Sequence, residues 1–172
     1  MKIFKDLKLK SGFSLIEILA VLFVVSTSLL GVVSLITQNI QVQSINRNNL
    51  IASSLAQEGV ELIRQVRDSN WRKNLPFDTD LAAGSYRIDY TQDKPIAINS
   101  VTDANIYLQS GFYINSSGGG PNLTPTVFSR QIFLDKPIGY AGSPLQVRTL
   151  ISWTDRNHPY NYELRALLFD WK

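Results

Sequence analysis

The distribution of apolar and polar residues divides the chain into three parts. Residues 13–36 form an apolar run that contains a single charge, Glu17. As a helix rising about 1.5 Å per residue, this run spans roughly 36 Å, which is enough to cross a hydrocarbon core of about 30 Å. The apolar stretch of a cleaved secretory signal is shorter, about 7–15 residues. The first part of the chain is therefore predicted to be a membrane-spanning helix.

A helical pattern continues beyond the apolar run. Residues 37–49 are polar with sparse apolar positions, and the first proline is Pro76. From residue 50 onward, apolar and small side chains recur at helical spacing. They form two adjacent stripes, Ile51, Leu55, Leu62 and Val66 on one, and Ala52, Ala56, Gly59 and Ile63 on the other. We therefore expect residues 37–70 to continue the helix, with an amphipathic second half that packs on other elements.

The third part, residues 71–172, alternates apolar and polar positions as β-strands do. Strands are predicted at residues 86–90, 106–108, 112–114, 127–134, 145–153 and 162–171. Loops rich in Gly, Pro, Asn and Asp separate the last three, which predicts an antiparallel meander. The expected fold class is α+β, with a long N-terminal helix packed on a C-terminal antiparallel β-sheet.

Charge is concentrated ahead of the apolar run. The chain has 17 Lys and Arg against 14 Asp and Glu, and residues 1–12 hold four lysines and one aspartate. The remaining residues include 13 basic and 13 acidic side chains and are formally neutral. By the positive-inside rule, the basic head stays in the cytoplasm and the C-terminal part lies outside. The neutral balance downstream gives no basis for strong nucleic-acid binding.

The sequence offers little for catalysis or cofactor binding. It contains no cysteine, which excludes disulfides, thiolate metal sites and cysteine nucleophiles. Its one histidine, His158, is predicted to lie in an exposed hairpin loop, and no nucleophile-elbow motif accompanies it. Asp78 and Asp80 are a weak candidate for a calcium site because two carboxylates alone do not complete one. We therefore expect no enzyme activity, no cofactor and no metal.

Glu17 is unusual because of where it lies. A carboxylate at the centre of a bilayer costs about 2.5–3.5 kcal/mol, so such residues usually have a function. Glu17 lies one helical turn into the apolar run, where the cost is lower. The two explanations are a functional acid and a tolerated acid whose side chain extends toward the interface.

The residues around Glu17 resemble the processing motif of type IV prepilins and pseudopilins. The matching stretch is Lys10-Ser11-Gly12-Phe13-Ser14-Leu15-Ile16-Glu17, behind a basic leader and ahead of an apolar helix. In that family, a prepilin peptidase cleaves after the glycine and methylates the new N-terminal amine, and a glutamate follows four residues later. The resemblance implies cleavage between Gly12 and Phe13, N-methylation of Phe13, and a role for Glu17 in subunit assembly.

The resemblance also implies a domain layout and partners. The leader is residues 1–12, the transmembrane and assembly helix is 13–36, the helix continuation is 37–70, and the globular sheet region is 71–172. The implied partners are other pilin or pseudopilin subunits, the prepilin peptidase, the inner-membrane assembly platform, and the lipid bilayer before assembly. The implied location is a single-pass inner-membrane protein that later enters a pilus or pseudopilus filament.

Two classes of function account for these features. The resemblance favours a structural, minor-pilin-like subunit, because the apolar helix lacks the proline, and the chain lacks the disulfide, of many major pilins. A pilus, a type II secretion pseudopilus and a DNA-uptake pseudopilus all stay open. The alternative is a signal-anchored membrane protein with an extracytoplasmic enzyme or ligand-binding domain, in which Glu17 has no assembly role.

Overall fold

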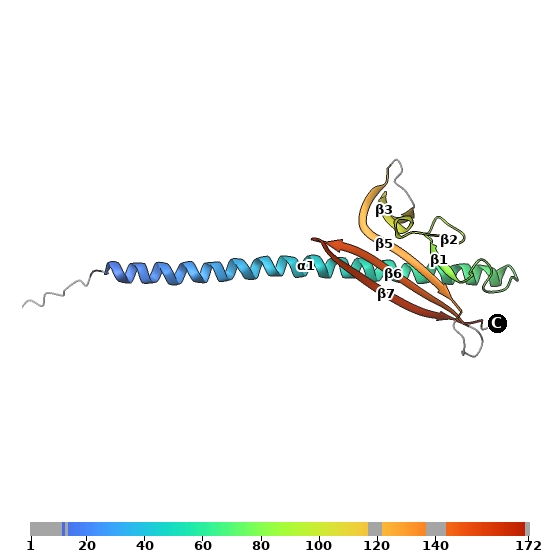
Figure 1. The fold of residues 1–172 in the computed structure, drawn as a ribbon, viewed down its shortest axis with the longest axis horizontal. Coiled ribbons are helices and arrows are strands. Elements are labelled where there is room, and N and C mark those ends of the chain that lie inside the picture. The colour runs from blue at the N-terminus through green and yellow to red at the C-terminus, as the bar shows by residue number, and fades with distance from the viewer. Residues whose placement is uncertain (1–11, 13, 117–121, 137–143, 171–172) are drawn as a thin grey trace, which may run out of the picture. The chain divides into compact units, whose positions relative to one another are not determined.

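The computed structural model contains one long helix followed by a seven-stranded antiparallel sheet (Figure 1). It describes residues 12, 14–116, 122–136 and 144–170. The elements in chain order are helix α1 (Leu15–Arg72), β1 (Gly84–Arg87), β2 (Ile96–Ala97), the 3-10 helix η1 (Val101–Ala104), β3 (Asn105–Gln109), β4 (Phe112–Ser116), β5 (Thr124–Asp135), β6 (Leu145–Asp155) and β7 (His158–Leu168). The predicted α+β fold, with a long N-terminal helix and an antiparallel sheet, is confirmed.

The chain divides into two compact units, Met1–Ser44 and Ile45–Lys172, and α1 contributes residues to both. In the first unit, every described residue from Ser14 to Gln43 is exposed, including the large apolar side chains. In the second unit, the helix has a buried face and the sheet supplies the other side of the core. The part of α1 in the first unit therefore has an exposed apolar surface, whereas the part in the second unit has a face that packs against the sheet.

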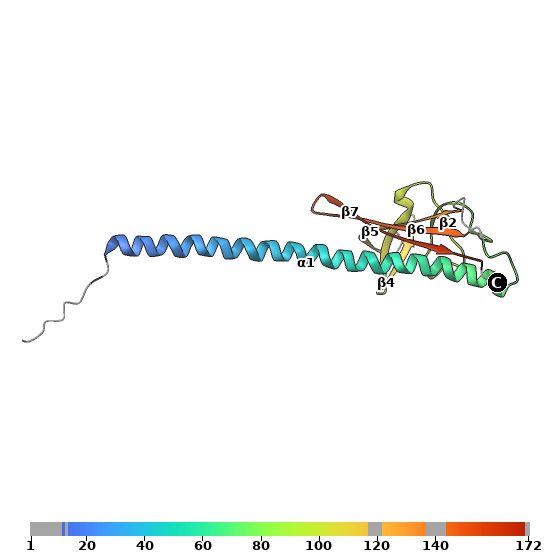
Figure 2. The same ribbon diagram turned by 90° about the horizontal axis from the view of Figure 1, so that it is seen from below.

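The buried face of α1 matches both predicted stripes. Its buried apolar and small residues are Ala52, Leu55, Ala56, Gly59, Val60, Leu62, Ile63 and Val66. They pack in two clusters against inward-facing residues of β5, β6 and β7, such as Ile132, Val147 and Ile151. Figures 1 and 2 show these strands lying along one side of this part of the helix. Each fully buried Leu, Ile or Val contributes about 1.5–3 kcal/mol, so this contact supplies much of the stability of the second unit.

Strand β5 is the centre of the sheet. It pairs with β6 along Phe128–Asp135, and β6 pairs with β7 along its whole length. Strands β1 and β3 also pair with β5, at Ile132–Leu134 and Thr124–Ser129 respectively. The antiparallel meander predicted for the last three strands is therefore confirmed, and the two shorter strands extend the sheet on the side of β5 away from β6.

Several predicted boundaries were wrong, and two of these errors have clear local reasons. Strand β1 ends at Arg87 instead of residue 90, because the Asp89 carboxylate accepts hydrogen bonds from the backbone of Thr91 at 2.8 Å and of Asn115 at 3.0 Å. Such side-chain acceptors favour a turn over continued pairing. At the other end, α1 continues to Arg72, since the indole of Trp71 is buried and donates to Asp170 at 3.2 Å.

The prediction that His158 lies in a hairpin loop was also wrong. Strand β7 begins at His158, which lies opposite Asp155 of β6. Only Arg156 and Asn157 connect the two strands, and both have positive φ, 48° and 65°. Two left-handed residues form the tight turn that matches the twist of a hairpin, so β7 starts directly after Asn157. The strand predicted at residues 162–171 therefore starts four residues earlier and ends at Leu168.

Gly59 sets how closely the helix approaches the sheet. A Cβ atom on Gly59 would lie 2.9 Å from Thr149 Cγ2, and Thr149 is fully buried. We expect Gly59→Ala to lower the free energy of unfolding despite the higher helix propensity of alanine, because a packed neighbour must move. Chemical denaturation of the full chain in detergent measures this change.

The matched test of that contact is a double variant. Thr149→Ser removes the Cγ2 atom that the new methyl group would meet, so Gly59→Ala should be less damaging in the Thr149→Ser background. Equal effects of Gly59→Ala in both backgrounds would show that the contact with Thr149 does not limit the approach.

Candidate functional site

The N-terminal candidate residues lie at the start of α1. Gly12 is exposed and precedes the helix, whereas Phe13 and residues 1–11 lie outside the described residues. The carbonyl of Ser14 accepts hydrogen bonds from the N–H groups of Glu17 at 3.0 Å and Ile18 at 3.1 Å, and these bonds close the first turn. Glu17 thus occupies the first helical turn, where the helix dipole favours a negative charge.

Glu17 is exposed and lies beside apolar side chains of its own helix. Ile18, Val21 and Leu22 line a shallow groove beside it. Across the part of the chain that the structure describes, no ion pair or hydrogen bond reaches the Glu17 carboxylate. Within the described residues, the Glu17 carboxylate is therefore open to a partner from solvent, from lipid headgroups or from another molecule.

Several hydroxyl side chains in and just after the apolar run form hydrogen bonds within the helix. Four hydroxyls donate to a carbonyl three or four residues earlier, and they are Ser26 to Leu22, Thr27 to Phe23 and Val24, Ser28 to Val24, and Thr37 to Val33. These bonds remove most of the penalty for placing hydroxyls in an apolar environment. By length and composition, α1 is able to cross a membrane, and this part of the prediction is supported.

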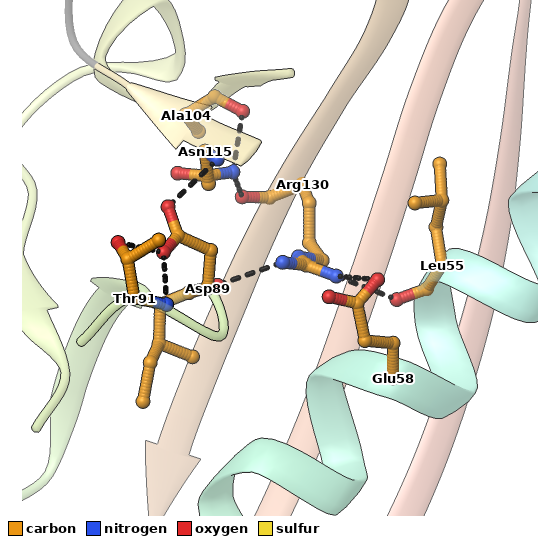
Figure 3. Close-up of polar contacts among 8 residues, drawn as sticks. Leu55, Glu58, Asp89, Thr91, Ala104, Asn115 and Arg130 are labelled. Carbon is orange, nitrogen blue, oxygen red and sulfur yellow. Dashed lines mark hydrogen bonds and ion pairs between the residues drawn. The ribbon is translucent and has the colours of Figure 1, made fainter. Parts of the chain in front are cut away.

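A second group of polar residues holds the C-terminal unit together, and sequence analysis missed it. Arg130 on β5 is 1% exposed. Its side chain lies between β5 and α1 and points toward α1 (Figure 3). Its Nη1 atom donates to the carbonyl of Leu55 at 3.1 Å and lies 3.0 Å from Glu58 Oε2. Its Nη2 atom donates to the carbonyl of Ile88 at 2.7 Å. One guanidinium thus connects the helix, the central strand and the segment after β1.

The same group continues into the smaller strands. The buried amide of Asn115 on β4 donates to the carbonyls of Ala104 at 3.1 Å and Arg130 at 3.2 Å. The Asp89 carboxylate accepts from Asn115 and from Thr91, as Figure 3 shows. Buried polar groups are costly when unpaired. These bonds therefore hold β4, η1 and the segment after β1 in position relative to β5.

The remaining candidates from the sequence are His158 and the suggested calcium site at Asp78 and Asp80. His158 is exposed at the start of β7. The Asp78 carboxylate forms an ion pair with Lys136, which already occupies one side of the suggested calcium site. No group of three or more His, Asp or Glu side chains arranged to hold a metal ion occurs among the residues that the structure describes.

Comparisons with known proteins give no relative for this chain. No family model matches it, and no curated protein or solved structure does. The case for a function therefore rests on the residues themselves.

Proposed function

We propose that this protein is a structural subunit of a type IV pilus or pseudopilus, made as a prepilin and assembled through its apolar N-terminal helix. The observation that carries the proposal is the register of Gly12, Phe13 and Glu17 behind a basic leader and ahead of an apolar helix. In this scheme, a prepilin peptidase cleaves between Gly12 and Phe13 and methylates the Phe13 amine. Gly12 suits a scissile position because a residue without Cβ lets a protease approach its backbone closely.

The exposed first part of α1 supports assembly. Its apolar side chains, such as Phe23 and Leu30, are 71% and 70% exposed. A helix covered with apolar side chains needs lipid or other helices around it. We propose that lipid surrounds it before assembly and that the helices of neighbouring subunits replace the lipid afterwards.

The carboxylate of Glu17 gives this assembly its register. Cleavage would create a positive amine at Phe13, and Glu17 has no partner among the described residues of its own chain. In a packed array of helices, the amine of a neighbour would neutralise Glu17. Loss of one partner from a buried ion pair costs about 3–5 kcal/mol, so this pairing would select one axial offset between subunits.

The proposed location follows from charge. Four lysines in the leader hold the N-terminus in the cytoplasm, so the β-sheet unit lies outside the membrane and later on the filament. The prepilin peptidase and the inner-membrane assembly platform are the expected partners at the membrane. The formally neutral remainder of the chain argues against strong nucleic-acid binding.

Mass spectrometry of the N-terminus tests the proposal. When the chain is expressed with a prepilin peptidase, we expect it to lose residues 1–12 and to carry one added methyl group on Phe13. The variant Gly12→Val should stay uncleaved. Gly31→Val is the matched control, because a side chain at Gly31 meets no atom within 4 Å, and it should be processed normally. An intact Met1, or a cut downstream of Ile36, would exclude a prepilin.

A further inference from the structure

The face of the sheet turned away from α1 carries charged and polar side chains. In the register of β5, β6 and β7, Phe133 lies opposite Arg148, and Arg148 lies opposite Arg165. The next row toward the end of β5 contains Asp135 opposite Gln146. Alternation along each strand places these residues on the face opposite the buried apolar core.

These side chains line a groove of about 510 Å³. Four strands contribute to it, with Ser85 from β1, Asp135 from β5, Gln146 and Arg148 from β6, and Arg165 from β7. Small-molecule sites in proteins typically measure about 300–1,000 Å³. The groove therefore has room for a ligand of the size of a monosaccharide unit or somewhat larger.

Among the described residues, the two arginines in the groove share a single ion-pair partner. Like charges directly opposite each other in a sheet are destabilising. Glu163 lies between them, accepting from Arg148 Nη1 at 3.3 Å and from Arg165 Nε. Among the described residues, no second carboxylate forms an ion pair with either guanidinium. One carboxylate is thus shared by two cations, and among the described residues the other N–H groups of the two guanidiniums have no carboxylate partner, although Asp135 in the same groove makes the groove's formal charge zero.

The two arginines are held differently. The Arg148 guanidinium stacks on the ring of Phe133, with its Cζ atom 3.8 Å from the ring centroid, and its side chain is 33% exposed. The Arg165 side chain is 62% exposed. The hydrogen bonds from Arg165 and Arg148 also hold the pKa of Glu163 below its ordinary value, which favours the ionised form as their shared acceptor. The Phe133 ring and Glu163 therefore orient the Arg148 guanidinium before a ligand arrives.

We propose that this groove binds an acidic saccharide whose carboxylate is held by Arg148 and Arg165. A guanidinium matches the planar carboxylate of a uronate with two parallel hydrogen bonds. Ser85 and Gln146 offer neutral donors and acceptors to hydroxyl groups, and Asp135 offers an acceptor. The charge of Asp135 also disfavours a more highly charged ligand such as a phosphate ester. The proposal does not depend on filament assembly.

Isothermal titration calorimetry of the full chain in detergent tests this site, with trigalacturonate as the probe. We expect binding of trigalacturonate and none of its methyl ester, which has the same hydroxyls and no charge. Arg165→Gln should weaken binding about tenfold, because a charge-assisted hydrogen bond is lost. Arg64→Gln is the matched control, since Arg64 lies on α1 and pairs with Glu61 outside the groove, and it should bind as well as the parent.

Three results would overturn the proposal. The first is no binding of trigalacturonate to the parent chain. The second is an equal loss of affinity in Arg165→Gln and Arg64→Gln, which would place the binding elsewhere. The third is displacement of trigalacturonate by inorganic phosphate at matched ionic strength and equal concentration, which would make the groove a general anion site. Thermal unfolding of both variants confirms that each is folded before titration.

Discussion

Replacement of Arg130 by alanine is expected to lower the free energy of unfolding of the C-terminal unit by about 3 kcal/mol or more. The change removes the ion pair with Glu58 and the hydrogen bond to the Ile88 carbonyl, and it leaves a cavity where a fully buried side chain stood. Domain stabilities are about 5–15 kcal/mol, so this loss is large. Denaturation of the full chain in detergent, followed by near-ultraviolet circular dichroism, measures it.

Two variants separate the causes of that loss. Arg64→Ala removes an exposed arginine paired with Glu61 on the same helix, and its effect should be below about 1 kcal/mol. Arg130→Met keeps most of the volume, so adding Glu58→Gln to it should restore part of the stability if the unpaired charge matters. An Arg130→Ala variant as stable as Arg64→Ala would mean that the buried contacts contribute nothing net.

Substitution of Glu17 by glutamine is expected to reduce the amount of the protein in filaments tenfold or more, while cleavage after Gly12 continues. In the proposed assembly, the uncharged amide would not neutralise the Phe13 amine of a neighbouring subunit. Loss of a buried ion-pair partner costs about 3–5 kcal/mol, well above the 1.4 kcal/mol of a tenfold change. Immunoblots of sheared filaments and of membranes measure the two pools, and mass spectrometry measures cleavage.

Glu61→Gln is the matched control for Glu17→Gln. It removes the same charge from an exposed position on α1 that pairs with Arg64, and filament content should stay normal. A normal filament content of Glu17→Gln would contradict an assembly role for this residue. That result would favour the alternative, a signal-anchored protein with an active domain outside the membrane, for which Glu17→Ala leaves function intact.

Much of the fold could be predicted because it depends on periodicity. The stripes of α1 and the alternation in β5–β7 follow directly from which residues are apolar, and the structure buries those residues. Some errors occur where a side chain replaces a backbone partner, and another occurs at the two-residue turn before His158. Asp89 ends β1 by accepting backbone hydrogen bonds, and periodicity carries no information about such an acceptor.

The burial of Arg130 is indicated in the sequence by its position in the alternation of β5. Phe128, Ile132 and Leu134 alternate on the inward face of β5, and position 130 belongs to the same face. An arginine at an inward position of an apolar strand has to find an acid or several carbonyls, and Glu58 on the helix is an available acid. Which carbonyls it reaches depends on tertiary packing, so Leu55 and Ile88 could not be named in advance.

The contacts of Arg130 also determine how the C-terminal unit responds to force. To slip one turn along the sheet, about 5.4 Å, this part of α1 would have to separate Leu55 and Glu58 from Arg130 at the same moment. Gly59 would leave its place beside Thr149, where no larger residue fits without displacement. A force along the helix therefore acts on β5 through the contacts of Arg130 with Leu55 and Glu58 at the same time. These contacts must break together before the helix can slide along the sheet.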